Sequence, residues 1–195
     1  MKKLVNLLLI GLLSVSVMAQ EETLSGGTLE NGGYGALLTQ VGQINGSTGF
    51  FMGGQGAWII NHRIGLGGKG YVLINIVEVN GLDNVKLKFG CGGGLIEYVI
   101  ASDKLLHGNI NCMIGGGGVR YDPIDYSDPH PEIDYSEDGV FVLELGADLI
   151  LNVAKKFRIG IGASYRIVSG VNYAELSNSD LNGFSGHLVL KFGAF

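Results

Sequence analysis

Two consecutive stretches decide the fold, and together they read GVFVLELGADLILNVAKKFRIGIGASYRIV over residues 139–168. From residue 139 to 153, apolar residues occupy every second position, and valine, isoleucine, glycine and acidic or amide residues fill the positions between them. The alternation resumes at Phe157, after a short link at 154–156. Because successive side chains of a strand point to opposite faces, this period predicts two long β-strands. The short link makes them a hairpin.

The same alternation, working outward from that hairpin, predicts an all-β chain of about eight antiparallel strands. Most of them reach the nine to eleven residues that a membrane-crossing strand needs. Short links at 61–62, 101–104 and 154–156 contrast with long polar connections at 121–138 and 169–182. That asymmetry is typical of an up-and-down transmembrane β-barrel of the outer membrane. The expected strands lie near residues 34–44, 49–60, 63–77, 84–101, 105–120, 139–153, 157–168 and 183–195.

The first residues have the pattern of a secretory signal peptide. Lys2 and Lys3 precede an apolar run that ends at the small residues Val17 and Ala19. This order predicts a signal peptide over 1–19, removed on export. We therefore expect a leader at 20–33, a barrel at 34–195, and a location in the outer membrane of a Gram-negative-type bacterium.

Composition narrows the class further. The chain has 34 glycines among 195 residues, yet 46% of it is apolar, and its formal net charge is −5. Glycine suits strands where a barrel interior is tight. An acidic chain with scattered lysines is a poor ligand for nucleic acid. We find no motif for a catalytic site, a metal or a cofactor, and expect none of the three.

Alternation alone does not say which face is inside. In a membrane barrel the apolar face meets lipid and the polar face points inward. Bulky apolar faces, glycine-rich polar faces and the signal peptide favour this arrangement. A soluble periplasmic binder of the lipocalin kind, with apolar faces lining a cavity, is an alternative.

The closing stretch, His187-Leu188-Val189-Leu190-Lys191-Phe192-Gly193-Ala194-Phe195, alternates and ends on an aromatic residue. In this, and in its overall pattern, the chain resembles the small eight-stranded outer-membrane barrels of the OmpA-transmembrane and OmpX type. The resemblance implies outer-membrane lipid as surroundings and recognition of the last strand by the barrel assembly machinery. One detail departs from the pattern: Phe195 falls in phase with Lys191, on the polar face.

The inferred polar faces carry charges that would meet inside the barrel. Buried charges must be paired, and eight strands leave room only for side chains. We therefore expect an interior network that fills the barrel rather than an ion path, with Glu144 and Asp148 beside the strand that bears Arg158 and Arg166. His187 also projects inward in this scheme. The predicted network comprises Lys69, Lys86, Lys88, Glu144, Asp148, Arg158, Arg166 and Lys191.

Two other groups of residues raise specific possibilities. Cys91 and Cys112 both fall on faces assigned to lipid, nearly opposite one another, so they are either two small apolar residues or a disulfide in an oxidising compartment. Ser185 and His187 share one face two residues apart, which leaves a lipid A-modifying barrel enzyme, an acyltransferase or deacylase, as an alternative function.

The long connection 121–138 contains all three prolines and no lysine or arginine. Loops on a rigid scaffold often carry binding residues, so this loop is the expected contact for an extracellular partner. Calcium binding and a merely solvated acidic loop are the other interpretations. Its acids are Asp122, Asp125, Asp128, Glu132, Asp134, Glu137 and Asp138.

The sequence thus predicts an outer-membrane barrel with a structural or surface-interaction role, and no enzyme activity.

Overall fold

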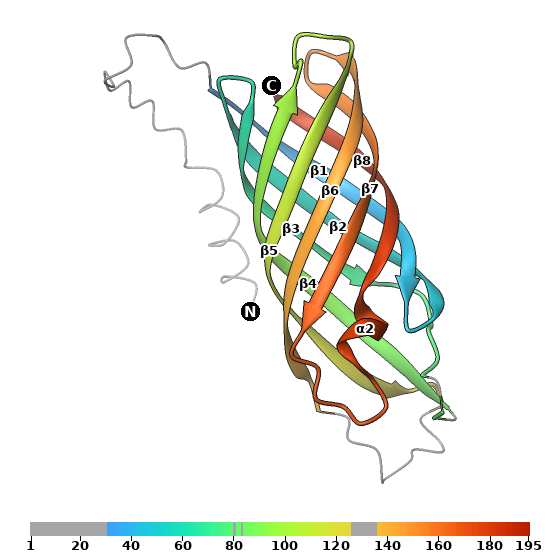
Figure 1. Ribbon diagram of the computed structural model, residues 1–195. Helices are drawn as coiled ribbons and strands as arrows, with labels where there is room; N and C mark the ends of the chain where they lie inside the picture. The colour runs from blue at the N-terminus through green and yellow to red at the C-terminus, as the bar shows by residue number, and fades with distance from the viewer. Residues whose placement is uncertain (1–30, 80, 83, 126–135) are drawn as a thin grey trace, which may run out of the picture.

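The computed structural model describes residues 31–79, 81–82, 84–125 and 136–195, and they form one closed antiparallel barrel (Figure 1). The predicted signal peptide and all of the predicted leader except residues 31–33 lie outside the described residues. Residues 31–33 belong to the first strand, which therefore starts slightly before the expected boundary. The strands are β1 (Asn31–Ile44), β2 (Ser47–Ile60), β3 (Ile64–Leu73), β4 (Val85–Ile100), β5 (Leu106–Pro123), β6 (Asp138–Ala154), β7 (Phe157–Ser169) and β8 (Gly183–Ala194).

The strand order confirms the predicted up-and-down topology. Each strand pairs with its neighbours in sequence, and β1 pairs with β8 from Gly33↔Ala194 to Gly42↔Ser185, which closes the barrel. The hairpin predicted from residues 139–168 is present, with Leu149 opposite Ile161. Closure leaves no sheet edge with unpaired backbone groups, as a strand in lipid requires.

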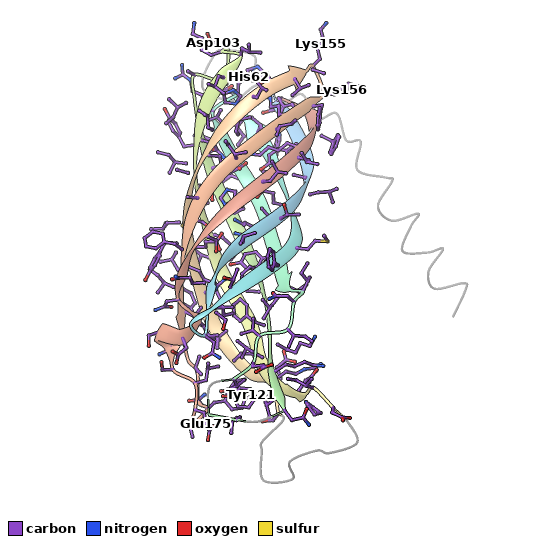
Figure 2. The ribbon with its side chains drawn as sticks, turned by 90° about the vertical axis from the view of Figure 1, so that its right-hand side faces the viewer. His62, Asp103, Tyr121, Lys155, Lys156 and Glu175 are labelled. Atoms are coloured by element: carbon purple, nitrogen blue, oxygen red, sulfur yellow. The ribbon has the colours of Figure 1, made fainter. Side chains whose placement is uncertain are left out.

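The two ends of the barrel differ. At one end, here called the short-turn end, His62, Asp103, Lys155 and Lys156 mark the connections between β2 and β3, β4 and β5, and β6 and β7 (Figure 2), and both termini of the barrel lie there (Figure 1). The opposite end, here called the long-loop end, holds the longer connections between β3 and β4, β5 and β6, and β7 and β8, together with the two-residue turn Asn45–Gly46 between β1 and β2.

A short helix, α2 (Asn178–Leu181), lies in the connection between β7 and β8. Ser177 begins it, and its backbone N–H donates to Asp180 Oδ2 at 2.8 Å. Leu181 at its end is fully buried and faces the barrel interior. Within the described ranges, no helix is long and apolar enough to cross a membrane.

Large apolar side chains cover the outside of the barrel. Phe184 is 70% exposed and Ile161 is 59% exposed, whereas soluble monomers rarely expose contiguous apolar surface on this scale. Outward aromatic residues gather at two levels, as in the girdles of membrane barrels. Trp58, Tyr98 and the stacked pair Phe157 and Phe192 lie toward the short-turn end, and Phe50, Phe141, Tyr165 and Phe184 toward the long-loop end.

This arrangement decides between the two faces. The predicted facing of β6, β7 and β8 is confirmed. The apolar residues at odd-numbered positions of β6 and β7, and at even-numbered positions of β8, point outward as expected. The lipocalin-like alternative required the bulky apolar faces to line a cavity, and they do not.

Strand β4 is the exception, and the prediction for it was wrong. Val85, Leu87 and Phe89 are buried inside the barrel, while Lys86 and Lys88 lie on the outer face. The reason is position: both lysines lie near the long-loop end of β4, where an outward side chain can reach the edge of the apolar surface. An outward lysine there costs far less than one in the middle of the membrane.

Many of the glycines differ in the space around them according to the face they occupy, with inward Gly160 and outward Gly118 as exceptions. On the inner face, a methyl group at Gly67 would lie 1.8 Å from the carbonyl oxygen of Gly56, so the approach of the strands requires glycine. On the outer face, a methyl group at Gly68 would have its nearest neighbour at 3.5 Å. Similarly close approaches occur at Gly53, Gly93, Gly115 and Gly117.

These neighbouring glycines give a matched pair of variants. We expect Gly67→Ala to lower the free energy of unfolding by about 1–3 kcal/mol, the usual cost of overpacking. We expect Gly68→Ala to leave it unchanged or slightly higher, since alanine has less conformational freedom to lose. Urea unfolding in detergent micelles, followed by gel mobility of unboiled samples, measures both. Equal effects at the two positions would contradict the facing of β3.

Candidate functional site

The interior of the barrel is divided along its axis. Toward the short-turn end and the middle it is lined by charged and amide side chains, and toward the long-loop end by apolar ones. This division matters for function because the polar half can hold charge, whereas the apolar half excludes water.

Glu97 is the centre of the polar half nearest the short-turn end. Its side chain is fully buried and accepts a hydrogen bond from Lys191 Nζ at 2.9 Å, forming an ion pair across the barrel. Asn109 Nδ2 donates to the same carboxylate at 2.9 Å, and the Tyr34 hydroxyl donates to its other oxygen. Lys191 also lies over the Tyr34 ring, 4.4 Å from its centre.

Asp148 forms a second centre beside the first. His187 Nε2 lies 2.5 Å from Asp148 Oδ1. Asn109 and Asn111 donate to Asp148 Oδ2 at 2.9 and 3.0 Å. Because Asn109 bonds both Glu97 and Asp148, the two centres form one connected network.

Glu144 forms a third centre, farther toward the long-loop end. Lys69 Nζ lies 2.6 Å from Glu144 Oε1, and both side chains are almost fully buried. The hydroxyl of Tyr71 donates to the second carboxylate oxygen. The pair joins β3 to β6, which do not neighbour one another in the sheet, so it ties opposite walls of the barrel together.

Arg166 fastens the long-loop end. Its Nε donates to the Leu181 carbonyl at 2.8 Å and its Nη2 to the Gln43 carbonyl at 3.1 Å. The guanidinium lies 4.9 Å from the Phe51 ring centre and 5.0 Å from that of Phe89. One buried cation thus holds α2 and the end of β1 through hydrogen bonds and two aromatic faces.

Beyond Arg166 the interior is filled by an apolar plug. Its members come from most of the strands and from the β7–β8 connection, and each is buried. Among the described residues, apolar side chains packed in this way offer few polar partners to water or to an ion in that half of the barrel. The plug includes Ile44, Phe51, Leu87, Val119, Tyr121, Val140, Leu176 and Leu181.

Six residues of the predicted interior network do lie inside: Lys69, Glu144, Asp148, Arg158, Arg166 and Lys191. Their partners differ from the expected ones. Glu144 pairs with Lys69 across the barrel, and Asp148 pairs with His187 over Gly162 of the intervening strand β7, rather than with the arginines of β7. Arg158 lies 3.9 Å from the centre of the Phe195 ring, and that ring stacks on Tyr34. The polar phase of Phe195 in the sequence is therefore its actual orientation.

Lys86 and Lys88 do not join the network, and sequence reasoning missed Glu97. A usable signal was present. Glu97 has the same parity as Val85, Leu87 and Phe89, so assigning that face to lipid placed a carboxylate in the membrane. The high free-energy cost of a carboxylate in the membrane predicts the opposite facing of β4, with Glu97 inside the barrel.

The possible disulfide between Cys91 and Cys112 is not formed; both thiols are free. In the register of β4 and β5, Cys91 lies opposite Gly117, and Cys112 opposite Ile96. Cys91 is on the inner face of β4 and Cys112 on the outer face of β5. The two cysteines do not face one another for two reasons. The facing of β4 is opposite to the predicted one, and the turn between β4 and β5 is centred farther along the chain than expected.

Ser185 and His187, the residues of the lipid A-modifying alternative, are both buried inside the barrel. That alternative needs a reactive pair at the outer rim, within reach of a lipid acyl chain. The imidazole of His187 instead faces Asp148 inside the wall of strands.

The described acids of the 121–138 loop point to different partners. Asp122 pairs with Arg120 at 3.2 Å, and Asp138 Oδ2 accepts the backbone N–H of Asn172 at 2.7 Å. Asp125 and Glu137 are exposed. Asp128, Glu132 and Asp134 lie outside the described residues. Within the described part of the chain, no three His, Cys, Asp or Glu side chains are grouped so as to hold a metal ion.

Comparison with solved structures shows which known proteins have a similar fold. The barrel superimposes on Neisserial surface protein A with a TM-score of 0.58, at 12% identity over 84% of this chain and 96% of that one. The chain has the fold of the small eight-stranded outer-membrane barrels. The N-terminal β-barrel domain of Pseudomonas aeruginosa OprF is similar with a TM-score of 0.53, at 9% identity over 82% of this chain and 96% of that one. Ail of Yersinia pestis, solved with a heparin analogue, gives 0.51 at 14% identity over 85% and 98%.

The sequence itself matches no family model and no curated protein. At such low identity the structural likeness establishes the fold and nothing finer.

The Glu97–Lys191 pair provides a test of the interior network. We expect Glu97→Gln and Lys191→Met each to lower the free energy of unfolding by about 3–5 kcal/mol, because each leaves one buried charge uncompensated. The double variant should recover part of that loss, since no charge remains unpaired. Urea titration in detergent micelles measures all three. Lys155→Met, at an exposed turn, is the control and should change nothing; strictly additive losses would show that the pair is not coupled.

Proposed function

We propose that the protein is a closed outer-membrane barrel, without catalysis, that acts structurally and through the surface at its long-loop end. The observation that carries this proposal is the filled interior. Three paired carboxylates occupy the polar half, and the apolar plug occupies the other. A protein whose interior is used up by its own side chains has its outer surface left for function.

The long-loop end is the end we assign to the cell exterior. In outer-membrane barrels, short turns face the periplasm and longer loops face outward. This places the connections between β3 and β4, β5 and β6, and β7 and β8 outside, together with the turn Asn45–Gly46 and with Glu175 (Figure 2). An extracellular partner would meet them there, with the 121–138 loop as its expected contact.

Two further partners follow from the same proposal. Outer-membrane lipid would surround the apolar outer face. The assembly machinery would recognise β8 before the barrel closes, because in the closed barrel Phe195 stacks on Tyr34 inside.

Conductance tests the closed interior. Refolded protein inserted into planar lipid bilayers should give no steady channel current, because the plug offers few polar partners to water or to an ion. Insertion is checked separately by resistance to alkaline carbonate extraction and by a heat-dependent shift in gel mobility. Long-lived ohmic openings from inserted protein would contradict the proposal.

Labelling with a membrane-impermeant maleimide tests the orientation. In a Cys91→Ala/Cys112→Ala background, we expect Ala174→Cys, in an exposed part of the β7–β8 connection, to react on intact cells. Lys155→Cys, at the opposite end, should react only after the outer membrane is permeabilised. The reverse pattern would invert the proposed orientation, and labelling of both in a soluble fraction would refute membrane insertion.

A further inference from the structure

The outer surface of the barrel has a groove to which the proposed function assigns no role. It lies between β3, β4 and β5 toward the long-loop end and has a volume of about 360 Å³. Its lining includes Val72, Lys88, Gly90, Gly118, Arg120 and Glu137.

The groove exists because glycines replace side chains at its floor. Gly90 and Gly118 are register partners on β4 and β5, and both are on the outer face. Lys88 and Arg120 form the next outward register pair, so two long cationic side chains border the floor on the same side. Val72, opposite Gly90 on β3, is the apolar border.

The charges of the groove favour an anion. Lys88 forms no ion pair with any residue in the described ranges. Arg120 uses its Nε for Asp122 at 3.2 Å, which leaves the terminal nitrogens of the guanidinium for another acceptor. Two carboxylates oppose this preference. Asp122 is already paired with Arg120, and Glu137 lies over Gly118, where an added methyl group would meet its Oε1 at 2.1 Å.

The level of the two cations on the barrel indicates the kind of anion. Toward the short-turn end, the outward positions of β4 after Lys88 are glycines followed by Ile96 and Tyr98, and those of β5 after Arg120 lead to Ile114. Lys88 and Arg120 therefore stand where the outward apolar series of β4 and β5 ends, while Ile74 and Ile76 continue the apolar surface on the neighbouring segment after β3. Lipid phosphates occupy that boundary of a bilayer, with acyl chains alongside the apolar face.

We propose that this groove binds one anionic lipid of the surrounding leaflet, with its phosphate on Lys88 and Arg120 and an acyl chain along the glycine floor. The inference rests on the proposed membrane insertion and orientation. Arginine and lysine side chains are both common phosphate ligands, and arginine can engage two phosphate oxygens at once. Gly118 lies beneath the Glu137 side chain, so the acyl chain would approach the sheet at Gly90, where the nearest side-chain atom to an added methyl group is Val72 Cγ1 at 3.1 Å.

The test is a titration of the refolded full barrel, in neutral detergent, with diphosphoryl lipid A, read by native mass spectrometry. We expect one tightly bound lipid, and a roughly tenfold rise in Kd for Lys88→Ala/Arg120→Ala, as expected when about 1.4 kcal/mol of binding is lost. Glu137→Gln should lower Kd, because it removes the opposing charge. Lys155→Ala/Lys156→Ala deletes two cations at the short-turn end and is the matched control, with an unchanged Kd.

Several outcomes would overturn the inference. An unchanged Kd in Lys88→Ala/Arg120→Ala, or an equal rise in the control variant, would show that the groove is not the site. Binding of dephosphorylated lipid with the same Kd would remove the role of the phosphate. Full competition by inorganic phosphate would remove the role of the chain. Failure of the barrel to resist carbonate extraction would instead refute the proposed function, so the two failures are distinguishable.

Discussion

The narrowness of an eight-stranded barrel is the constraint from which the other features follow. Such a barrel has room inside only for side chains, so an inward residue must be very small where strands approach closely, and must be partnered where it is charged. The inner glycines show the first solution: at Gly67 even a methyl group would collide with the backbone of β2. The carboxylates show the second, since Glu97, Asp148 and Glu144 each have a cationic or imidazole partner within 3 Å.

The division of the interior has a physical rationale. A buried ion pair contributes little net stability, but breaking one is costly. The three pairs connect strands that are not neighbours, so together they specify which walls of the barrel meet. The apolar plug adds burial without this specificity, and Arg166 links the two parts by binding the Leu181 and Gln43 carbonyls. In the proposed function, a barrel built in this way would support the connections at its long-loop end.

The residues of the outer surface are less constrained, because few neighbouring atoms of the protein pack against them. Outward glycines such as Gly68 and Gly94 are not required by neighbouring atoms, whose nearest approaches to an added methyl group are 3.5 and 3.9 Å. Bulky apolar residues cover most of the remaining outer face. The groove beside Lys88 and Arg120 thus differs from the surrounding surface, because two cationic side chains border a depression in it.

The sequence by itself determined the number and order of strands, the membrane-barrel class, the two classes of connection and the facing of β6 to β8. These depend on a period of two residues and on chain length, which are local properties. It did not determine the facing of β4, where Lys86 and Lys88 near one strand end look the same as interior lysines until Glu97 is weighed against them. Nor could it assign ion-pair partners: Lys69 and Glu144 are 75 residues apart, and Lys191 and Glu97 are 94 apart, on strands that do not pair. Only closure of the barrel brings those walls within reach of one another, and no local pattern encodes which side chains then meet.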